Sequence, residues 1–260
     1  MLQSGMTSVT FRQLTPQQIV ELSRQGGLDG IEWGGDVHCP PSLNETVKEN
    51  NMEIQKMTAN MGLQIFSYGS YCHLGDPDNT NDFFQVLVDT AKQLHASTIR
   101  VWAGRKSSAD ATDSYYRQIA RDFYRLCEIA APAGLTVSTE YHRGSLTDCS
   151  PSAVKLLRYV NAPNARTYWQ PNPDLSLSEN QKELTEVLPY LSNVHLYNWK
   201  KGNIRFPLRD GAENWNKYFS ILMTSRRNHN LIMEFVKDDS PEQFLQDAAE
   251  LAIWMKHFTI

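Results

Sequence analysis

Residues 135–148, LTVSTEYHRGSLTD, decide the fold of this chain. The run from Leu135 to Thr139 is short and rich in β-branched residues, which predicts a strand. This strand ends abruptly in Glu140 and His142, two polar groups that a buried strand does not need for packing. An unpaired buried carboxylate is costly, so Glu140 requires a nearby Lys, Arg or metal ion. For this residue alone, a structural ion pair and a functional site both remain open.

The composition is that of an ordinary soluble globular protein, with 260 residues of which 41% are hydrophobic and 21% charged. We expect residues 1–260 to form a single domain, because this length lies near the upper size of one core. The net charge of −4 gives no basic excess for nucleic acid. No apolar run reaches the roughly 20 residues of a membrane span, and the first residues lack the features of a signal peptide. We therefore expect a cytoplasmic protein without membrane or nucleic-acid partners.

Short β-rich runs alternate with helical patterns along the whole chain. The predicted strands are 6–11, 30–33, 63–70, 97–104, 135–140, 165–170, 193–199 and 230–236. The predicted helices are 16–25, 44–61, 81–95, 110–133, 151–160, 179–188, 211–227 and 241–258. Eight such units in 260 residues favour an α/β protein with a (β/α)8 TIM barrel. A doubly wound open sheet is the alternative, but no G-x-G-x-x-G motif follows the first strand.

In such a barrel the residues that finish the strands meet at one mouth. They are Glu32, Trp33, Tyr68, His73, Arg100, Trp102, Glu140, His142, Trp169, Gln170, His195 and Glu234. Tryptophan is frequent at these ends, and aromatic faces beside polar groups suit a sugar, whose C–H surfaces stack on rings. The alternative is that these aromatic residues belong to the upper layer of the core.

Glu140, Gln170, His195 and Glu234 stand at the ends of four consecutive predicted strands. Two carboxylates, an imidazole and an amide oxygen are ligands that a divalent cation accepts, and they favour Mn²⁺, Mg²⁺, Co²⁺ or Zn²⁺ over a soft metal. Each residue also has a structural interpretation, since a single His is often a core residue and a single Gln often a polar layer residue. Four such residues at four neighbouring ends favour a metal site.

The chain resembles the xylose isomerase-like barrel superfamily. The resemblance runs from SVTFRQL through GLDGIEWGGDVH, STEYHRGSLTD and NVHLYNW to LIMEFV. It points to the broad group of sugar phosphate isomerases and epimerases, which includes ketose 3-epimerases, inosose dehydratases, hydroxypyruvate isomerase and, more distantly, endonuclease IV. The family's metal ligands, Glu, Asp, His and Glu, fall on Glu140, Gln170, His195 and Glu234. Gln170 departs from the pattern, and we expect weaker metal binding because an amide carries no charge.

The resemblance implies a metal-dependent sugar isomerase or epimerase that acts on a keto-sugar or related polyol through an enediolate. Glu140 and Glu234 are then the catalytic pair, one acting as base and the other as acid. Candidate substrate-binding residues are Glu32, Trp33, His73, Arg100, Trp102, His142, Trp169, Lys201 and Arg205. Lys201 and Arg205 belong to a basic loop after the seventh strand, which either closes over the mouth or is a solvated surface.

Other functions stay open at this point. Loss of a β-hydroxyl would make the enzyme a dehydratase of a keto-inositol or keto-sugar, and Gln170 leaves room for a sugar-binding barrel without catalysis. An AP endonuclease is disfavoured by the negative net charge and by the Trp102 that stands where a metal-binding His would be needed. Neither the substrate nor a homo-oligomeric state is marked by any motif.

Overall fold

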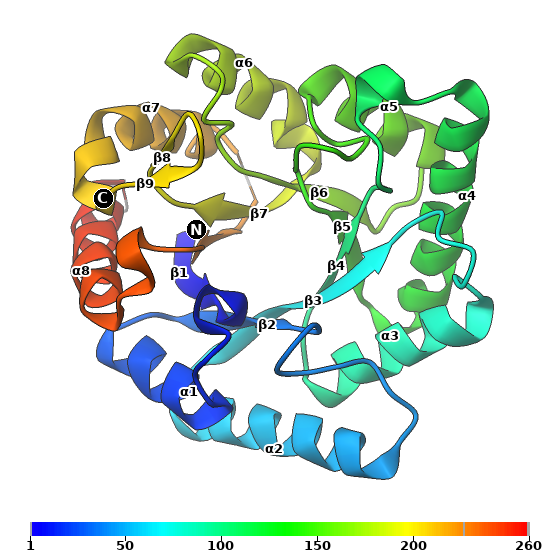
Figure 1. The fold of residues 1–260 in the computed structure, drawn as a ribbon, viewed down its shortest axis with the longest axis horizontal. Helices are drawn as coiled ribbons and strands as arrows, with labels where there is room; N and C mark the ends of the chain where they lie inside the picture. The colour runs from blue at the N-terminus through cyan, green and yellow to red at the C-terminus, as the bar shows by residue number, and fades with distance from the viewer. Residues whose placement is uncertain (1, 226, 259–260) are drawn as a thin grey trace.

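The computed structural model describes residues 2–225 and 227–258, and the barrel with its helices occupies this whole span. Met1, Arg226, Thr259 and Ile260, which the predicted domain includes, lie outside the described residues. Eight parallel strands form a closed barrel in the order β1-β10-β7-β6-β5-β4-β3-β2 (Figure 1). They are β1 Leu2–Thr7, β2 Gly30–Gly34, β3 Gln64–His73, β4 Thr98–Trp102, β5 Thr136–Thr139, β6 Ala165–Trp169, β7 Leu191–Leu196 and β10 His229–Met233. The predicted (β/α)8 TIM barrel is therefore confirmed.

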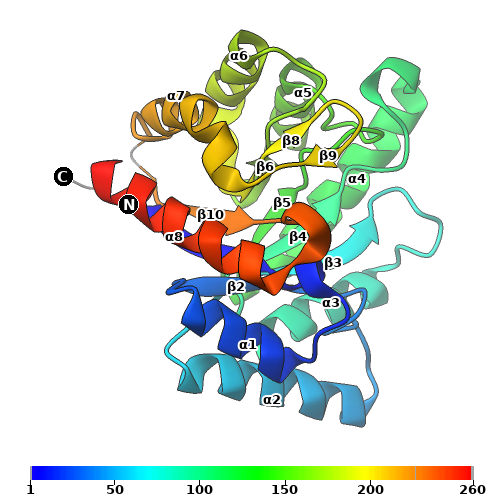
Figure 2. The ribbon, with the colours of Figure 1, turned by 60° about the vertical axis from the view of Figure 1, so that its left-hand side comes forward.

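Eight helices form a ring around the strands (Figure 1). They are α1 Pro16–Gln25, α2 Glu45–Asn60, α3 Asn81–Gln93, α4 Asp113–Ala130, α5 Ser150–Val160, α6 Leu177–Val187, α7 Ala212–Leu222 and α8 Pro241–Phe258. The last helix contacts α1 and α7 and so completes the ring (Figure 2). Within residues 2–225 and 227–258, no helix combines the length and apolar character that crossing a bilayer requires.

The first strand begins earlier than predicted. Residues 6–11 were expected to form it, but β1 ends at Thr7 and Ser8–Phe11 is a buried 3-10 helix. The sequence of β1, LQSGMT, contains a glycine, which is unfavourable in a strand. That glycine is needed, since a Cβ on Gly5 would lie 2.6 Å from the ring of Phe66, which crosses the barrel interior. A packing constraint from another strand therefore outweighs local β-propensity here.

The seventh unit also differs from its prediction. The strand expected over 193–199 ends at Leu196, and Trp199–Lys200 (β8) pairs antiparallel with Ile204–Arg205 (β9) as a separate hairpin. The helix expected over 211–227 ends at Leu222. The hairpin stands at the same end of the barrel as the carboxyl ends of the strands (Figure 2).

Candidate active site and metal centre

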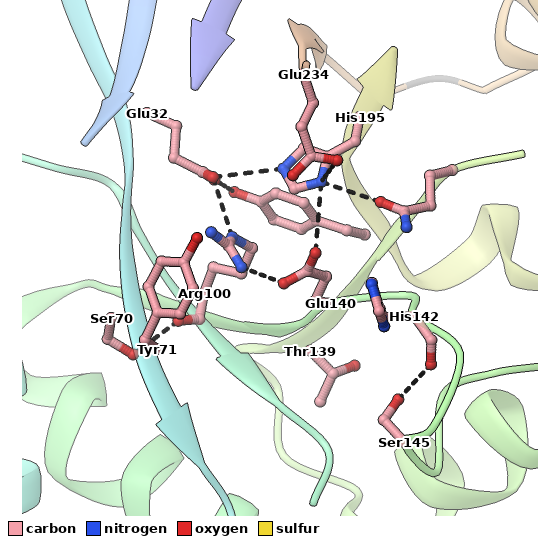
Figure 3. A network of polar contacts seen from close by, with 12 residues as sticks. Glu32, Ser70, Tyr71, Arg100, Thr139, Glu140, His142, Ser145, His195 and Glu234 are labelled. Carbon is pink, nitrogen blue, oxygen red and sulfur yellow. Dashed lines mark hydrogen bonds and ion pairs between the residues drawn. The ribbon is translucent and has the colours of Figure 1, made fainter. Parts of the chain in front are cut away.

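The strands bring polar side chains together at the carboxyl end of the barrel (Figure 3). Glu140 follows β5, Gln170 follows β6, and Glu234 follows β10, while His195 lies near the end of β7. The pairing of neighbouring strands places these ends side by side. For example, Ile232 of β10 pairs with His195 of β7. Glu140, His195 and Glu234 are all buried. Four residues that are far apart in the sequence thus share one small interior volume.

His195 is the centre of this arrangement. Its Nδ1 lies 3.1 Å from Gln170 Oε1, 3.6 Å from Glu234 Oε2 and 3.8 Å from Glu140 Oε1. Ligand atoms of Glu140, His195 and Glu234 all lie within 4.8 Å of one another. Oxygen and nitrogen donors at this mutual spacing can share one divalent cation.

Glu32 occupies the opposite side of the His195 ring. Its Oε1 lies 3.4 Å from His195 Nε2, and its Oε2 accepts hydrogen bonds from Ser67 Oγ at 2.7 Å and from the Tyr168 hydroxyl at 2.8 Å. A carboxylate on this side favours the tautomer with the proton on Nε2, which leaves the lone pair of Nδ1 directed at the other donors. The residues present therefore fit a divalent metal ion.

The charge of the cluster supports the same conclusion. Glu32, Glu140 and Glu234 supply three carboxylates, whereas Arg100 supplies one guanidinium, and all four side chains are buried. Burial raises the pKa of Glu234, and the neighbouring Glu140 raises it further. Burial alone would lower the pKa of His195, but the carboxylates of Glu234 and Glu32 outweigh it and raise that pKa. The three buried carboxylates outnumber the single buried guanidinium, and a divalent cation would supply further positive charge.

Arg100 contacts two of these carboxylates at once. Its Nε donates to Glu32 Oε1 at 3.0 Å and its Nη1 donates to Glu140 Oε2. Burial opposes the charge of Arg100, but Glu140 and Glu32 raise its pKa well above the ordinary value. Glu32 and Arg100, both predicted to bind substrate, are thus paired with each other, and Arg100 also binds Glu140.

An aromatic group forms one wall of the mouth. Trp102 packs between two histidine rings, with centroids 5.0 Å from His73 and 4.3 Å from His142. Its indole Nε1 is buried and has no hydrogen-bond partner among the described residues. Tyr71, which sequence reasoning missed, lies close by with its ring 5.4 Å from the Arg100 guanidinium. It has a φ of 56°, a backbone conformation that no local sequence signal indicated.

Comparison with known proteins identifies the family. The family model described as "Xylose isomerase-like TIM barrel" matches residues 20–257 of this chain. The chain belongs to the xylose isomerase-like TIM barrel family.

Among members of known activity, a 3-dehydroshikimate dehydratase of Bacillus anthracis is 24% identical over 206 residues, which are 75% of this chain and 71% of that protein. The crystal structure of the probable 3-DHS dehydratase AsbF of Bacillus anthracis superposes with a TM-score of 0.80 and 19% identity, covering 97% of this chain and 99% of that one.

Two further structures share the fold of this xylose isomerase-like barrel. D-psicose 3-epimerase from Clostridium cellulolyticum H10, with D-tagatose, has a TM-score of 0.74 and 13% identity, covering 98% of both chains. A xylose isomerase-like TIM barrel protein from Mycobacterium smegmatis in complex with magnesium has a TM-score of 0.77 and 14% identity, covering 99% of this chain and 98% of that one.

Two tryptophans predicted to bind substrate face away from the mouth of this family member. Trp33 and Trp169 are both 0% exposed. Trp169 packs against Trp215 and Tyr218 of α7, with ring centroids 6.4 Å and 5.0 Å away. Side chains alternate along a strand, so the residue next to an inward-facing Glu32 or Tyr168 points to the helices. We therefore correct the prediction, and assign Trp33 and Trp169 to the layer between strands and helices.

The basic residues of the hairpin also lie apart from the metal cluster of this xylose isomerase-like barrel. Arg205 pairs with Asp239 and stacks over Trp199 and Phe235, with its guanidinium 5.6 Å and 5.0 Å from the ring centroids. Lys201 is exposed in the turn between β8 and β9. The structure thus brings neither cation against Glu140 or Glu234.

The space beside the candidate metal ligands is small. A cavity of about 30 Å³ is lined by residues that include His142, Gln170 and Trp199. Arg143 holds the hairpin over this region, because it donates to Asn203 at 2.5 Å and to Asp174 at 2.7 Å.

Proposed function

We propose that this chain is a divalent-metal-dependent enzyme that removes a proton next to the carbonyl of a polyhydroxylated ketone. The observation that carries the proposal is the convergence of Glu140, Gln170, His195 and Glu234 on one point inside the barrel mouth. A bound divalent ion would polarise the substrate carbonyl and stabilise the enediolate. The related dehydratase and epimerase both act on hydroxylated compounds, which supports this substrate class.

Each neighbouring residue then has a definite role. Glu32 orients His195, and Arg100 holds Glu140 in place by donating to its Oε2. The wall of His73, Trp102 and His142 offers rings for the C–H face of the substrate, and the unpartnered Trp102 Nε1 offers a donor to a hydroxyl. Glu234 is the base, because its carboxylate lies in the cluster 3.6 Å from His195, and burial raises its pKa and hence its basicity.

Two reaction outcomes compete, and the bond between Arg100 and Glu140 separates them. Epimerisation by the predicted pair needs Glu140 and Glu234 to exchange protons from opposite faces of one carbon. Arg100 donates to Glu140 Oε2, whereas no Arg or Lys among the described residues donates to Glu234. This difference favours Glu234 over Glu140 as the acid–base group.

One acid–base group is sufficient for a dehydratase. Glu234 takes the proton from the α-carbon, the bond from the β-carbon to its hydroxyl breaks, a C=C bond forms, and the proton returns with the hydroxide as water. We therefore favour dehydration of a cyclic hydroxyketone, of the kind that the name 3-dehydroshikimate dehydratase describes for the Bacillus anthracis relative. The sequence-based epimerase or isomerase remains the second candidate, supported by the shared fold of D-psicose 3-epimerase.

The test is a substrate screen in D₂O with enzyme reconstituted with Mn²⁺ or Mg²⁺. The screen contains 3-dehydroshikimate, inososes and keto-hexoses, and it follows ¹H signals by NMR together with the ultraviolet absorbance of a conjugated product. A dehydratase gives conjugated product, whereas an epimerase gives deuterium at the α-carbon of an unchanged skeleton. The absence of both from every substrate, with metal bound, would contradict the proposal and favour a sugar-binding barrel.

A further inference from the structure

A cavity lies at the opposite end of the barrel from the candidate metal residues. Its volume is about 690 Å³, and residues at the amino ends of the strands line it, among them Gln3, Gln64, Arg166, Asn193 and Asn230. This volume is within the range of small-molecule sites in proteins. An apolar cluster of Phe66, Tyr168 and Ile232 fills the barrel interior, and separates this cavity from the catalytic mouth.

The charge of this cavity is unusual. Its lining contains Arg166 and Arg227, but among residues 2–225 and 227–258 it contains no Asp, Glu or Lys. The remaining polar lining comprises amide and hydroxyl side chains, including those of Thr98, Ser192 and Asn193, together with the imidazole of His95. Burial lowers the pKa of Arg166, and the positive charge of Arg227 lowers it further, which shows that the two guanidinium groups repel each other.

The position of Arg166 in its strand explains why it is short of partners. Arg166 is two residues before Tyr168 on β6, so both side chains point into the barrel. Arg166 donates one hydrogen bond, to the carbonyl of Ala165 at 2.6 Å, and the described residues show no second acceptor for it. A guanidinium group has five N–H donors, and one this short of acceptors favours an anion.

We propose that this lower cavity binds a small, doubly charged oxyanion between Arg166 and Arg227, with phosphate as the chemical type. Guanidinium groups bind such oxyanions through paired N–H donors, and the neutral amides around them can complete the hydrogen bonding. The ligand is either free phosphate or the phosphate group of a metabolite. The site goes beyond the proposed function, and its test requires neither metal nor turnover.

The test is isothermal titration of inorganic phosphate and, separately, glycerol 3-phosphate into the full chain in the presence of EDTA. Saturable binding of at least one of them at millimolar concentration is expected, and the tighter ligand identifies the source of the oxyanion. Arg166→Gln and Arg227→Gln should each weaken binding by about tenfold or more, since each removes a charged partner. Circular dichroism and thermal unfolding confirm that the variants remain folded.

Two control variants locate the site. Arg117→Gln removes an exposed guanidinium from α4 and should leave phosphate binding unchanged. His195→Ala changes the catalytic mouth and should leave it unchanged as well. If neither phosphate compound binds, or if binding survives both Arg166→Gln and Arg227→Gln, the proposal is overturned. An equal loss in Arg117→Gln would show nonspecific attraction and would overturn it too.

Discussion

His195 faces Glu32 across 3.4 Å with its Nε2, while its Nδ1 faces the three remaining metal-ligand candidates. Glu32 lies on β2, far from those candidates in the sequence, and is 0% exposed. A carboxylate behind a ligating histidine fixes the ring and raises its basicity. The geometry of the candidate metal site therefore depends on a residue that does not itself belong to the proposed ligand set.

Replacing Glu32 should weaken metal binding. Glu32→Gln keeps the shape but removes the charge that orients His195, and we expect a loss of about 10- to 100-fold in Mn²⁺ affinity, measured by titration calorimetry. Ser67→Ala, which removes only one hydrogen bond to Glu32, should have a smaller effect. Unchanged Mn²⁺ affinity in Glu32→Gln would exclude this role.

Replacing Glu234 and replacing Glu140 should lower turnover in different ways. Glu234→Gln should lower turnover by about 10²- to 10⁴-fold even at saturating Mn²⁺, because it removes the base as well as one oxygen of the ligand group. Glu140→Gln should abolish turnover mainly through loss of metal, since its oxygen belongs to the ligand group. Turnover and metal content, measured on the same preparations, separate these effects. Glu213→Gln, an exposed change on α7, is the control, and retained activity in Glu234→Gln would remove it as the base.

Gln170 should limit metal affinity. Gln170→Glu adds a carboxylate 25 residues before His195, at a position whose present Oε1 lies 3.1 Å from Nδ1. The added negative charge should increase affinity for Mn²⁺, because the Coulomb energy near a divalent ion is large in a partly buried site. Gln170→Ala should reduce affinity instead. Equal affinities in the three proteins would show that residue 170 is not a ligand.

The aromatic residues should divide into stabilising and substrate-binding groups. Trp169→Ala should cost about 3–5 kcal/mol of unfolding free energy in urea, because it empties a buried site against α7. Trp102→Ala should cost less and should chiefly raise KM, since Trp102 lies at the mouth. If Trp169→Phe raised KM and left the unfolding free energy unchanged, the original prediction that Trp169 binds substrate would be restored.

Stability should fall on acidification, partly because of His229. Burial lowers the pKa of His229 below its ordinary 6.5, against the opposing hydrogen bond to the Ser192 carbonyl. As the pH falls below 6.5, the unfolded chain therefore takes up this proton before the folded one does, and unfolding free energy is lost. His229→Gln should flatten the pH dependence between 7 and 5 in urea titrations. An unchanged slope would show that another group controls it.

The convergence of the four candidate ligands was predictable because each stands at or near the end of a strand. Glu140, Gln170, His195 and Glu234 could be assigned from their positions after short apolar runs, since strand ends converge in any barrel. Tyr71 could not be predicted, because its place depends on an unusual backbone φ of 56°. The inward or outward direction of Trp33 and Trp169 was also misjudged, because a shift of one residue in a strand reverses the face to which it points.

The sequence by itself determined the alternation of eight strands and helices, and the identity of four donors at the ends of four strands, because both are local patterns of hydrophobicity and residue type. Only the tertiary structure decided the partners. It joined Arg100 to Glu140 as well as Glu32, and it placed Arg166 in a cavity lined by Arg227 but, among the described residues, by no carboxylate. These pairings depend on register and side-chain direction across distant strands, which no local pattern records.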